Sequence, residues 1–145
     1  MNLEKHYERL NDMYRAAPIN QGYDTKLTLS EGKAAVELSI EPSYFHSAHS
    51  LHGAIFFKVL DEAASFSAYT LETEFFMVTS SFTTYITRPI NDGVLKSVGR
   101  VISSTKSQCL AEAVAFNSQG NEVARGSGMF VRSKIPFTLA LGYEK

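Results

Sequence analysis

A histidine–glycine pair and a carboxylate eight residues after the glycine could together act on a carbonyl group. His52-Gly53 begins a stretch with helical periodicity, and Asp61 lies within that stretch. Amides in the first turn of a helix have no partner within the helix and lie at the positive end of its dipole, so the Gly53 amide could stabilise negative charge on a carbonyl oxygen. A carboxylate can activate water or attack the carbonyl directly. Ser65 lies four residues after Asp61, on the same helix face, within reach of a common water.

The spacing of these groups predicts a shared site. Gly53 and Asp61 are separated by about 12 Å along a helix that rises ~1.5 Å per residue. One chain therefore cannot present both groups to one carbonyl. We expect Asp61 to come from a second subunit whose helix runs antiparallel alongside, which gives two equivalent sites in a symmetric dimer.

Each residue also has a purely structural interpretation. An acid in an apolar helix is costly to bury without a partner, so Asp61 could instead be exposed or paired with a basic residue. His52-Gly53 could simply begin a helix, and Ser65 could be a small core residue. Taken together, the order of glycine, acid and hydroxyl favours catalysis.

The sequence favours neither a metal site nor a cofactor. His46, His49 and His52 recur at spacing three, but positions i, i+3 and i+6 do not share one helix face. Cys109 is the one cysteine and has no partner for a disulfide or a zinc site, so we expect a small buried apolar residue there. The chain has no G-x-S-x-G motif, which argues against an α/β serine hydrolase.

The sequence pattern around these residues predicts the elements that position them, and these form one α+β domain over residues 1–145. Residues 3–15 have the periodicity of an amphipathic helix within an N-terminal segment 1–20, and the stretch 51–71 is apolar on nearly all faces, as in a buried helix. A β-hairpin is expected around residues 27–40, a polar loop at 41–50 and a tail of uncertain structure at 133–145. Four further β-type segments cover residues 77–87, 94–103, 108–117 and 122–132. Turn residues between them predict an antiparallel meander.

Small residues predict that the long helix packs into the concave side of this sheet. They alternate along two strands and recur on the helix: Ala111, Ala113, Ala115, Ala124, Gly126 and Gly128 on the strands, and Ala63, Ala64, Ser67 and Ala68 on the helix.

Composition excludes several classes of protein. The chain has 145 residues, with 14 basic and 15 acidic side chains and a net charge of -1, so no general electrostatic field attracts nucleic acid or an anionic membrane. No apolar run approaches the ~20 residues of a membrane span, and the N-terminus lacks a basic region followed by an apolar run. We therefore expect a cytosolic protein with neither nucleic acid nor membrane as a partner.

Two stretches of the sequence together resemble the signature of a known protein family. Leu51-His52-Gly53-Ala54 and Leu60-Asp61-Glu62-Ala63-Ala64 resemble the HGG…D signature of hotdog-fold acyl-CoA thioesterases, in particular the phenylacetate-pathway (PaaI-like) group. Supporting matches over roughly residues 20–132 are Tyr85-Ile86-Thr87-Arg88-Pro89 and Ala124-Arg125-Gly126-Ser127-Gly128. The resemblance implies an antiparallel sheet wrapped around a long central helix, a dimer or dimer of dimers with the active site at the subunit interface, and hydrolysis of a thioester to a free acid and coenzyme A.

The resemblance also implies roles for single residues. Asp61 matches the catalytic carboxylate, and Gly53 matches the amide that polarises the thioester carbonyl. His52 would shape that loop, and Ser65 matches a hydroxyl that assists water or carboxylate in some members.

The sequence departs from the family pattern at two positions. Ala54 replaces the second glycine, and His46 stands where relatives usually have Asn or Gln to position the water or the carbonyl. Ala54, Thr79 and Arg88 are the candidate substrate contacts. The candidate partners of the coenzyme A phosphates are basic residues that the sequence does not rank: Arg88, Lys96, Arg100, Lys106 and Arg125.

Two other functions stay open at this point. A hotdog-type dehydratase or hydratase would pair His46 or His49 with Asp61, although the sequence lacks the Phe-Pro-Gly run of such enzymes. A non-catalytic acyl-CoA binding module would keep the fold alone. Phenylalanines near the proposed site suit an aromatic or medium acyl chain and suit a core equally well: Phe56, Phe57, Phe75, Phe76 and Phe82.

Overall fold

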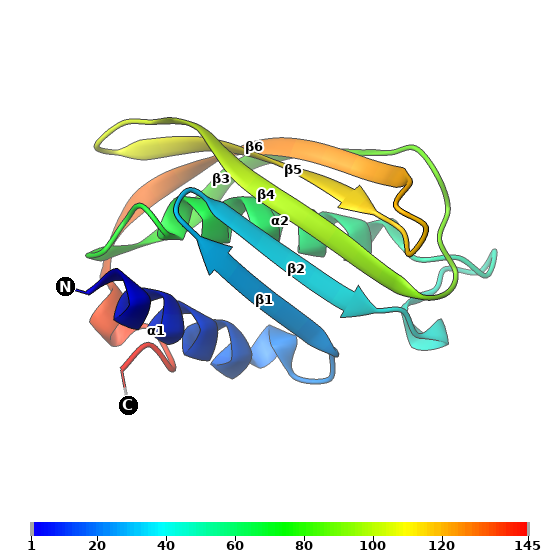
Figure 1. Ribbon diagram of the computed structural model, residues 1–145, viewed down its shortest axis with the longest axis horizontal. Helices are drawn as coiled ribbons and strands as arrows, with labels where there is room; N and C mark the ends of the chain where they lie inside the picture. The colour runs from blue at the N-terminus through cyan, green and yellow to red at the C-terminus, as the bar shows by residue number, and fades with distance from the viewer. Residues whose placement is uncertain (1, 145) are drawn as a thin grey trace.

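The computed structural model describes residues 2–144, which form two α-helices and a six-stranded antiparallel sheet (Figure 1). The two ends of the predicted domain, residues 1 and 145, lie outside the described residues. The α-helices are α1 (Leu3–Ala16) and α2 (Gly53–Tyr69). The strands are β1 (Thr25–Ser30), β2 (Lys33–Ser39), β3 (Phe75–Ile86), β4 (Val94–Ser104), β5 (Gln108–Phe116) and β6 (Glu122–Pro136). Short 3-10 turns at Pro18–Asn20, Pro42–Tyr44 and Phe137–Leu139 complete the chain. The predicted α+β architecture with a long central helix is confirmed.

The strand order corrects the predicted meander. Strands β4, β5 and β6 do follow one another, but β3 pairs with β6 at one edge of the sheet, and β4 pairs with β2, in the order β1-β2-β4-β5-β6-β3. The connection after β3 crosses one end of the sheet, where buried Ile90 accepts a hydrogen bond from the Leu51 amide (2.9 Å). Turn residues such as Gly93, with φ 77°, show where the chain reverses direction but not which strand it joins next.

Helix α2 lies very close to the middle of the sheet. Ala111, Ala113 and Ala115 of β5 are buried beneath it, as predicted. The closest approach is at a glycine that the sequence analysis did not single out. A Cβ atom on Gly99 of β4 would lie 2.1 Å from the carbonyl oxygen of Ala63, so only glycine fits there.

The glycines of β6 have a different role from the predicted one. Cβ atoms on Gly126 and Gly128 would each come within 2.5 Å of the Phe82 ring of the neighbouring strand β3. These glycines therefore make room for the backbone of β3 and for an aromatic side chain on it, rather than for the helix backbone. Phe82 in turn contacts Phe57 of α2, with 5.6 Å between ring centroids.

The C-terminal tail closes the end of the molecule at which α2 terminates. In Figure 1, α1 and the C-terminal turn lie at one end, and the loops before α2 and after β3 lie at the other. The buried His6 ring contacts the Tyr69 carbonyl oxygen through Nε2 (2.8 Å) and the Tyr143 hydroxyl through Nδ1 (2.7 Å). Because a carbonyl only accepts, Nε2 carries the proton and Nδ1 accepts from Tyr143.

Substitution of Gly99 tests the close approach of α2 to β4. We expect Gly99→Ala to lower the free energy of unfolding by about 1–3 kcal/mol, because the added methyl group would push the Ala63 turn of α2 away from the sheet. Val98→Ala, at an exposed position on the same strand, is the matched control and changes stability by less. Urea denaturation measures both. Equal stability of the two variants would show that the helix shifts without cost.

Candidate functional site

The first turn of α2 presents one free backbone amide. His52 caps the helix, and its Nδ1 accepts a hydrogen bond from the Ala54 amide (2.9 Å). The Gly53 amide has no hydrogen-bond acceptor among residues 2–144. Because the Ala54 amide is already used, the Gly53 amide is the donor in this turn that can bind a ligand oxygen.

A pocket of about 320 Å³ opens beside this amide. It brings together three residues predicted from the sequence, namely His46, Gly53 and Arg88, which come from three separate segments. The remaining lining residues come from the loop before α2, from α2 itself and from the end of β3 and its following turn: Ser50, Leu51, Phe56, Ile86, Thr87 and Pro89. Among the five basic residues proposed to hold phosphate groups, Arg88 is the one that lines this pocket.

Asp61 lies two turns further along α2 in an environment that disfavours its charged form. Burial raises the pKa of its carboxyl group above the usual range, and a hydrogen bond from Thr79 Oγ1 to Asp61 Oδ1 (2.9 Å) opposes part of that rise. No lysine, arginine or histidine in the described part of the chain forms an ion pair with Asp61. The ion-pair interpretation of Asp61 is therefore excluded for the chain by itself.

The adjacent acid has a different role. Glu62 accepts hydrogen bonds from Lys58 Nζ (2.8 Å) and from the Tyr14 hydroxyl (3.0 Å), and Lys58 also donates to Asn20 (2.6 Å). This partly buried network joins α2 to α1 and to the turn after it. Of the two neighbouring acids, Glu62 is held by structural partners and Asp61 is left available.

Strand β3 runs beside α2 and contacts it at three positions. Thr79 bonds Asp61, the Phe82 ring packs on Phe57, and Ile86 lies beside Gly53, where an added Cβ atom would be 3.4 Å from Ile86 Cδ1. Gly53, Phe57 and Asp61 are four residues apart and so follow one face of the helix.

The other residues predicted for the site lie apart from it in the single chain. Ser65 is buried, and its hydroxyl donates to the Glu62 carbonyl oxygen (3.2 Å) rather than toward Asp61. Asp61 itself is not among the residues that line the Gly53 pocket. Gly53 and Asp61 therefore have separate surroundings in the single chain, eight residues apart on one face of α2.

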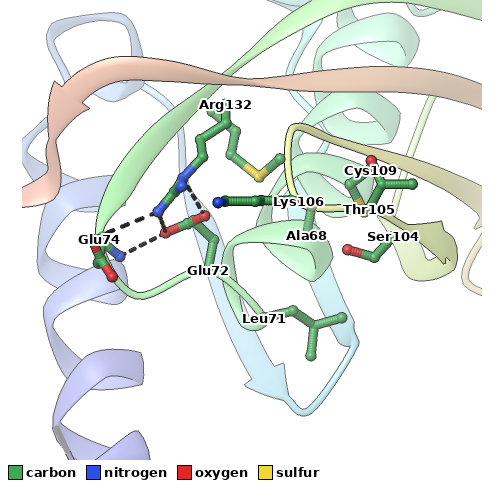
Figure 2. A pocket seen from close by; sticks show the side chains of 10 residues that line it. Ala68, Leu71, Glu72, Glu74, Ser104, Thr105, Lys106, Cys109 and Arg132 are labelled. Carbon is green, nitrogen blue, oxygen red and sulfur yellow. Dashed lines mark hydrogen bonds and ion pairs between the residues drawn. The ribbon is translucent and has the colours of Figure 1, made fainter.

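A second pocket, of about 340 Å³, lies at the opposite end of α2 (Figure 2). Its Ala68 is fifteen residues from Gly53, about 22 Å along a helix axis. Arg132 is flanked there by Glu72 and Glu74 in ion pairs, and Lys106 reaches in from the β4–β5 turn. Both acids pair with Arg132, and the distance excludes this pocket from the candidate site.

The phenylalanines that the sequence did not distinguish lie in different surroundings. Phe56 is buried and lines the Gly53 pocket, whereas Phe57 is 41% exposed on the face between Gly53 and Asp61. Phe75 packs under Arg132, and Phe76 packs on Tyr69, both beyond the far end of α2. Ile86 is a neighbour of Gly53 that the sequence did not indicate, because its only signal was its place in the stretch 85–89.

Comparison with solved structures identifies the fold of this chain. No family model and no curated protein matches the chain. Among solved structures, the chain is similar to the PaaI protein from the phenylacetic acid degradation operon of E. coli, at 21% identity over 92% of this chain and 96% of that one, with a TM-score of 0.81. The chain has the hotdog fold.

Two further structures share this hotdog fold. A thioesterase family protein from Silicibacter pomeroyi is 20% identical over 87% of this chain and 96% of that one, with a TM-score of 0.77. A variant of the phenylacetic acid degradation protein PaaI from Thermus thermophilus is 18% identical over 80% of this chain and 99% of that one, with a TM-score of 0.73. At these identities the likeness establishes the fold.

Neither a metal-binding cluster nor a membrane-spanning helix occurs among residues 2–144. These residues contain no group of three or more histidine, cysteine, aspartate or glutamate side chains placed to hold a metal ion. None of their helices is both long enough and apolar enough to cross a membrane.

The hydrogen bond from Thr79 allows a direct test of the Asp61 environment. We expect Thr79→Val to raise the pKa of Asp61 further, because the bond that favours the carboxylate is lost while the burial remains. Carbon-13 NMR titration of the aspartate carboxyl groups measures the change. Thr79→Ser keeps a hydroxyl and is the control. A pKa that is the same in Thr79→Val and in the original protein would show that the hydrogen bond does not act on Asp61.

Proposed function

We propose that this protein is an acyl-CoA thioesterase that works as a symmetric dimer. The Gly53 amide of one subunit and the Asp61 carboxylate of the other would act on the same thioester. The observation that carries the proposal is the state of Asp61, a partly buried carboxylate without an ion-pair partner among residues 2–144, on the same helix face as a free amide. A partly buried carboxylate without an ion-pair partner lowers the stability of the fold, so its presence favours a functional role.

The exposed surface of the chain supports the dimer. The outer edge of β3 pairs with no strand among the described residues. Apolar side chains are exposed along this edge and on the adjoining face of α2: Phe57, Val78, Tyr85 and Ile86. An edge strand of this kind is a template for pairing with a second β3. Antiparallel pairing of the two edges would bring the two α2 helices alongside each other.

The reaction then follows from the two groups. The Gly53 amide donates to the thioester carbonyl oxygen and stabilises the negative charge that develops as the carbonyl carbon is attacked. The Asp61 carboxylate of the other subunit either removes a proton from the attacking water or attacks to form an anhydride that water opens. In both routes the carbon–sulfur bond breaks, the thiolate takes up a proton, and the products are a carboxylic acid and coenzyme A. Arg88, which lines the Gly53 pocket, would contact the coenzyme A portion.

Replacement of the carboxylate tests the chemistry. We expect Asp61→Asn to lower thiol release from acyl-CoA by roughly 10²–10⁴-fold, the usual contribution of such a group. The same change should raise the Tm at neutral pH, because burial raises the pKa of Asp61 in the folded protein. The raised pKa means that the folded state loses stability as pH rises and the group ionises, and asparagine removes that loss. Unchanged thiol release in Asp61→Asn would exclude Asp61 as the catalytic group.

A mixing experiment tests whether each site is shared between subunits. Gly53→Val obstructs the amide side, and Asp61→Asn removes the carboxylate side. When the two inactive variants exchange subunits, each mixed dimer should regain one intact site, from the Gly53 of one chain and the Asp61 of the other. Each mixed dimer should therefore have at most about half of the activity of the original dimer, and an equal mixture, in which about half of the dimers are mixed, should recover to at most about a quarter. A mixture of dimers that exchange subunits but stay inactive would show that Gly53 and Asp61 do not meet across the interface.

Reaction with crotonyl-CoA distinguishes the thioesterase from the hydratase and from the binding module. Because His46 lines the same pocket as Gly53, a hydratase pairing of His46 with Asp61 makes a distinct prediction. With crotonyl-CoA, a thioesterase releases free thiol, whereas a hydratase removes the conjugated double bond and leaves the thioester intact. A binding module binds acyl-CoA and does neither.

A further inference from the structure

The spacing of the proposed site places one residue on the axis of the dimer. Where Gly53 of one antiparallel helix faces Asp61 of the other, position 53 of each chain opposes position 61, and the two-fold axis passes the position midway between them, residue 57. Each of the two sites then lies about 6 Å from that axis, four residues at ~1.5 Å per residue. Phe57 would therefore stand between the two sites.

Phe57 is well suited to form a fixed wall at this place. It is 41% exposed in the single chain and follows the same helix face as Gly53 and Asp61. Its ring meets Phe82 edge to face, at 5.6 Å between centroids and 88° between planes. Phe82 is held in turn by Gly126 and Gly128, because its ring occupies the space that side chains on those residues would need. The Phe57–Phe82 pair is thus supported from below by the sheet.

The two ends of a bound thioester have different requirements. The coenzyme A portion is long and charged, so it needs an opening to solvent, and the Gly53 pocket provides one with Arg88 at its edge. The carbonyl oxygen is fixed at the Gly53 amide, and the carboxylate approaches from Asp61 of the other subunit. The acyl group is left to run along the helix face toward the Phe57–Phe82 pair.

We propose that the Phe57–Phe82 pair is the end wall of the acyl site and limits the substrate to short or aryl acyl groups. This inference rests on the proposed function. About 6 Å of helix face between the reacting carbonyl and the axis accommodates a chain of a few carbons or one ring, and an aromatic wall favours a ring through edge-to-face contact. A longer straight chain would collide with the Phe57 rings of both subunits.

Two substitutions of Phe57 in opposite directions test the wall. The readout is the ratio of kcat/KM for decanoyl-CoA to that for butyryl-CoA, with benzoyl-CoA as the aryl substrate. We expect Phe57→Ala to raise this ratio by about tenfold or more, since several methylene groups gain the room that the phenyl ring now takes up. Phe57→Trp should lower the ratio. Ile102→Ala on β4, at a similarly exposed position (45%), is the control and should leave the ratio unchanged.

The outcomes separate this inference from the proposed function. Light scattering first establishes that each variant remains a dimer. If Phe57→Ala dissociates, the ratio measured for Phe57→Trp decides. An unchanged ratio in the dimeric Phe57 variants, with thiol release intact in the original protein, would overturn the wall and leave the thioesterase standing. Absence of thiol release from all acyl-CoA substrates in the original protein would overturn the function itself.

Discussion

The close approach of α2 to the sheet is the constraint on which the rest of this structure depends. Gly99 allows the Ala63 turn to come so near β4 that an added methyl group would collide with it. This contact fixes the height of the helix above the sheet, and the edge strand β3 then lies along one helix face. The pairing of Thr79 with Asp61, of Phe82 with Phe57 and of Ile86 with Gly53 follows from that placement.

The two ends of α2 differ in burial and in how their backbone groups are hydrogen-bonded. At its C-terminal end, His6 bonds the Tyr69 carbonyl oxygen, and the C-terminal tail covers the helix with a cluster of buried rings. At its N-terminal end, the Gly53 amide stays free beside a pocket. The closed end supplies stability through burial and satisfied hydrogen bonds, which lets the open end keep an unpaired donor that adds none. A similar division holds within α2, where Glu62 is neutralised by Lys58 and Asp61 is not.

Much of the fold followed from local patterns. The periodicity of residues 3–15 and the apolar run around 51–71 predicted both helices, because a buried helix needs apolar residues on nearly every face. The strand segments were placed to within a few residues for the same kind of reason. The pairing of β3 with β6 was not predictable, because adjacent segments in the sequence pair by default and only the connection through Ile90 carries β4 past β3 to β2. Gly126 and Gly128 make room for β3 instead of the helix, a difference that the sequence does not predict because a glycine does not show which neighbour fills its space.

The sequence by itself determined which groups could do chemistry and that Gly53 and Asp61 cannot meet within one chain. Helix rise is the same in every helix, so their separation follows from the numbering alone. Only the tertiary structure decided which acid is held by a base, which phenylalanine faces outward and which arginine lies beside the pocket. Those outcomes depend on contacts between segments far apart in the chain, such as Lys58 with Asn20 and Phe82 with Gly128, and no local pattern encodes them.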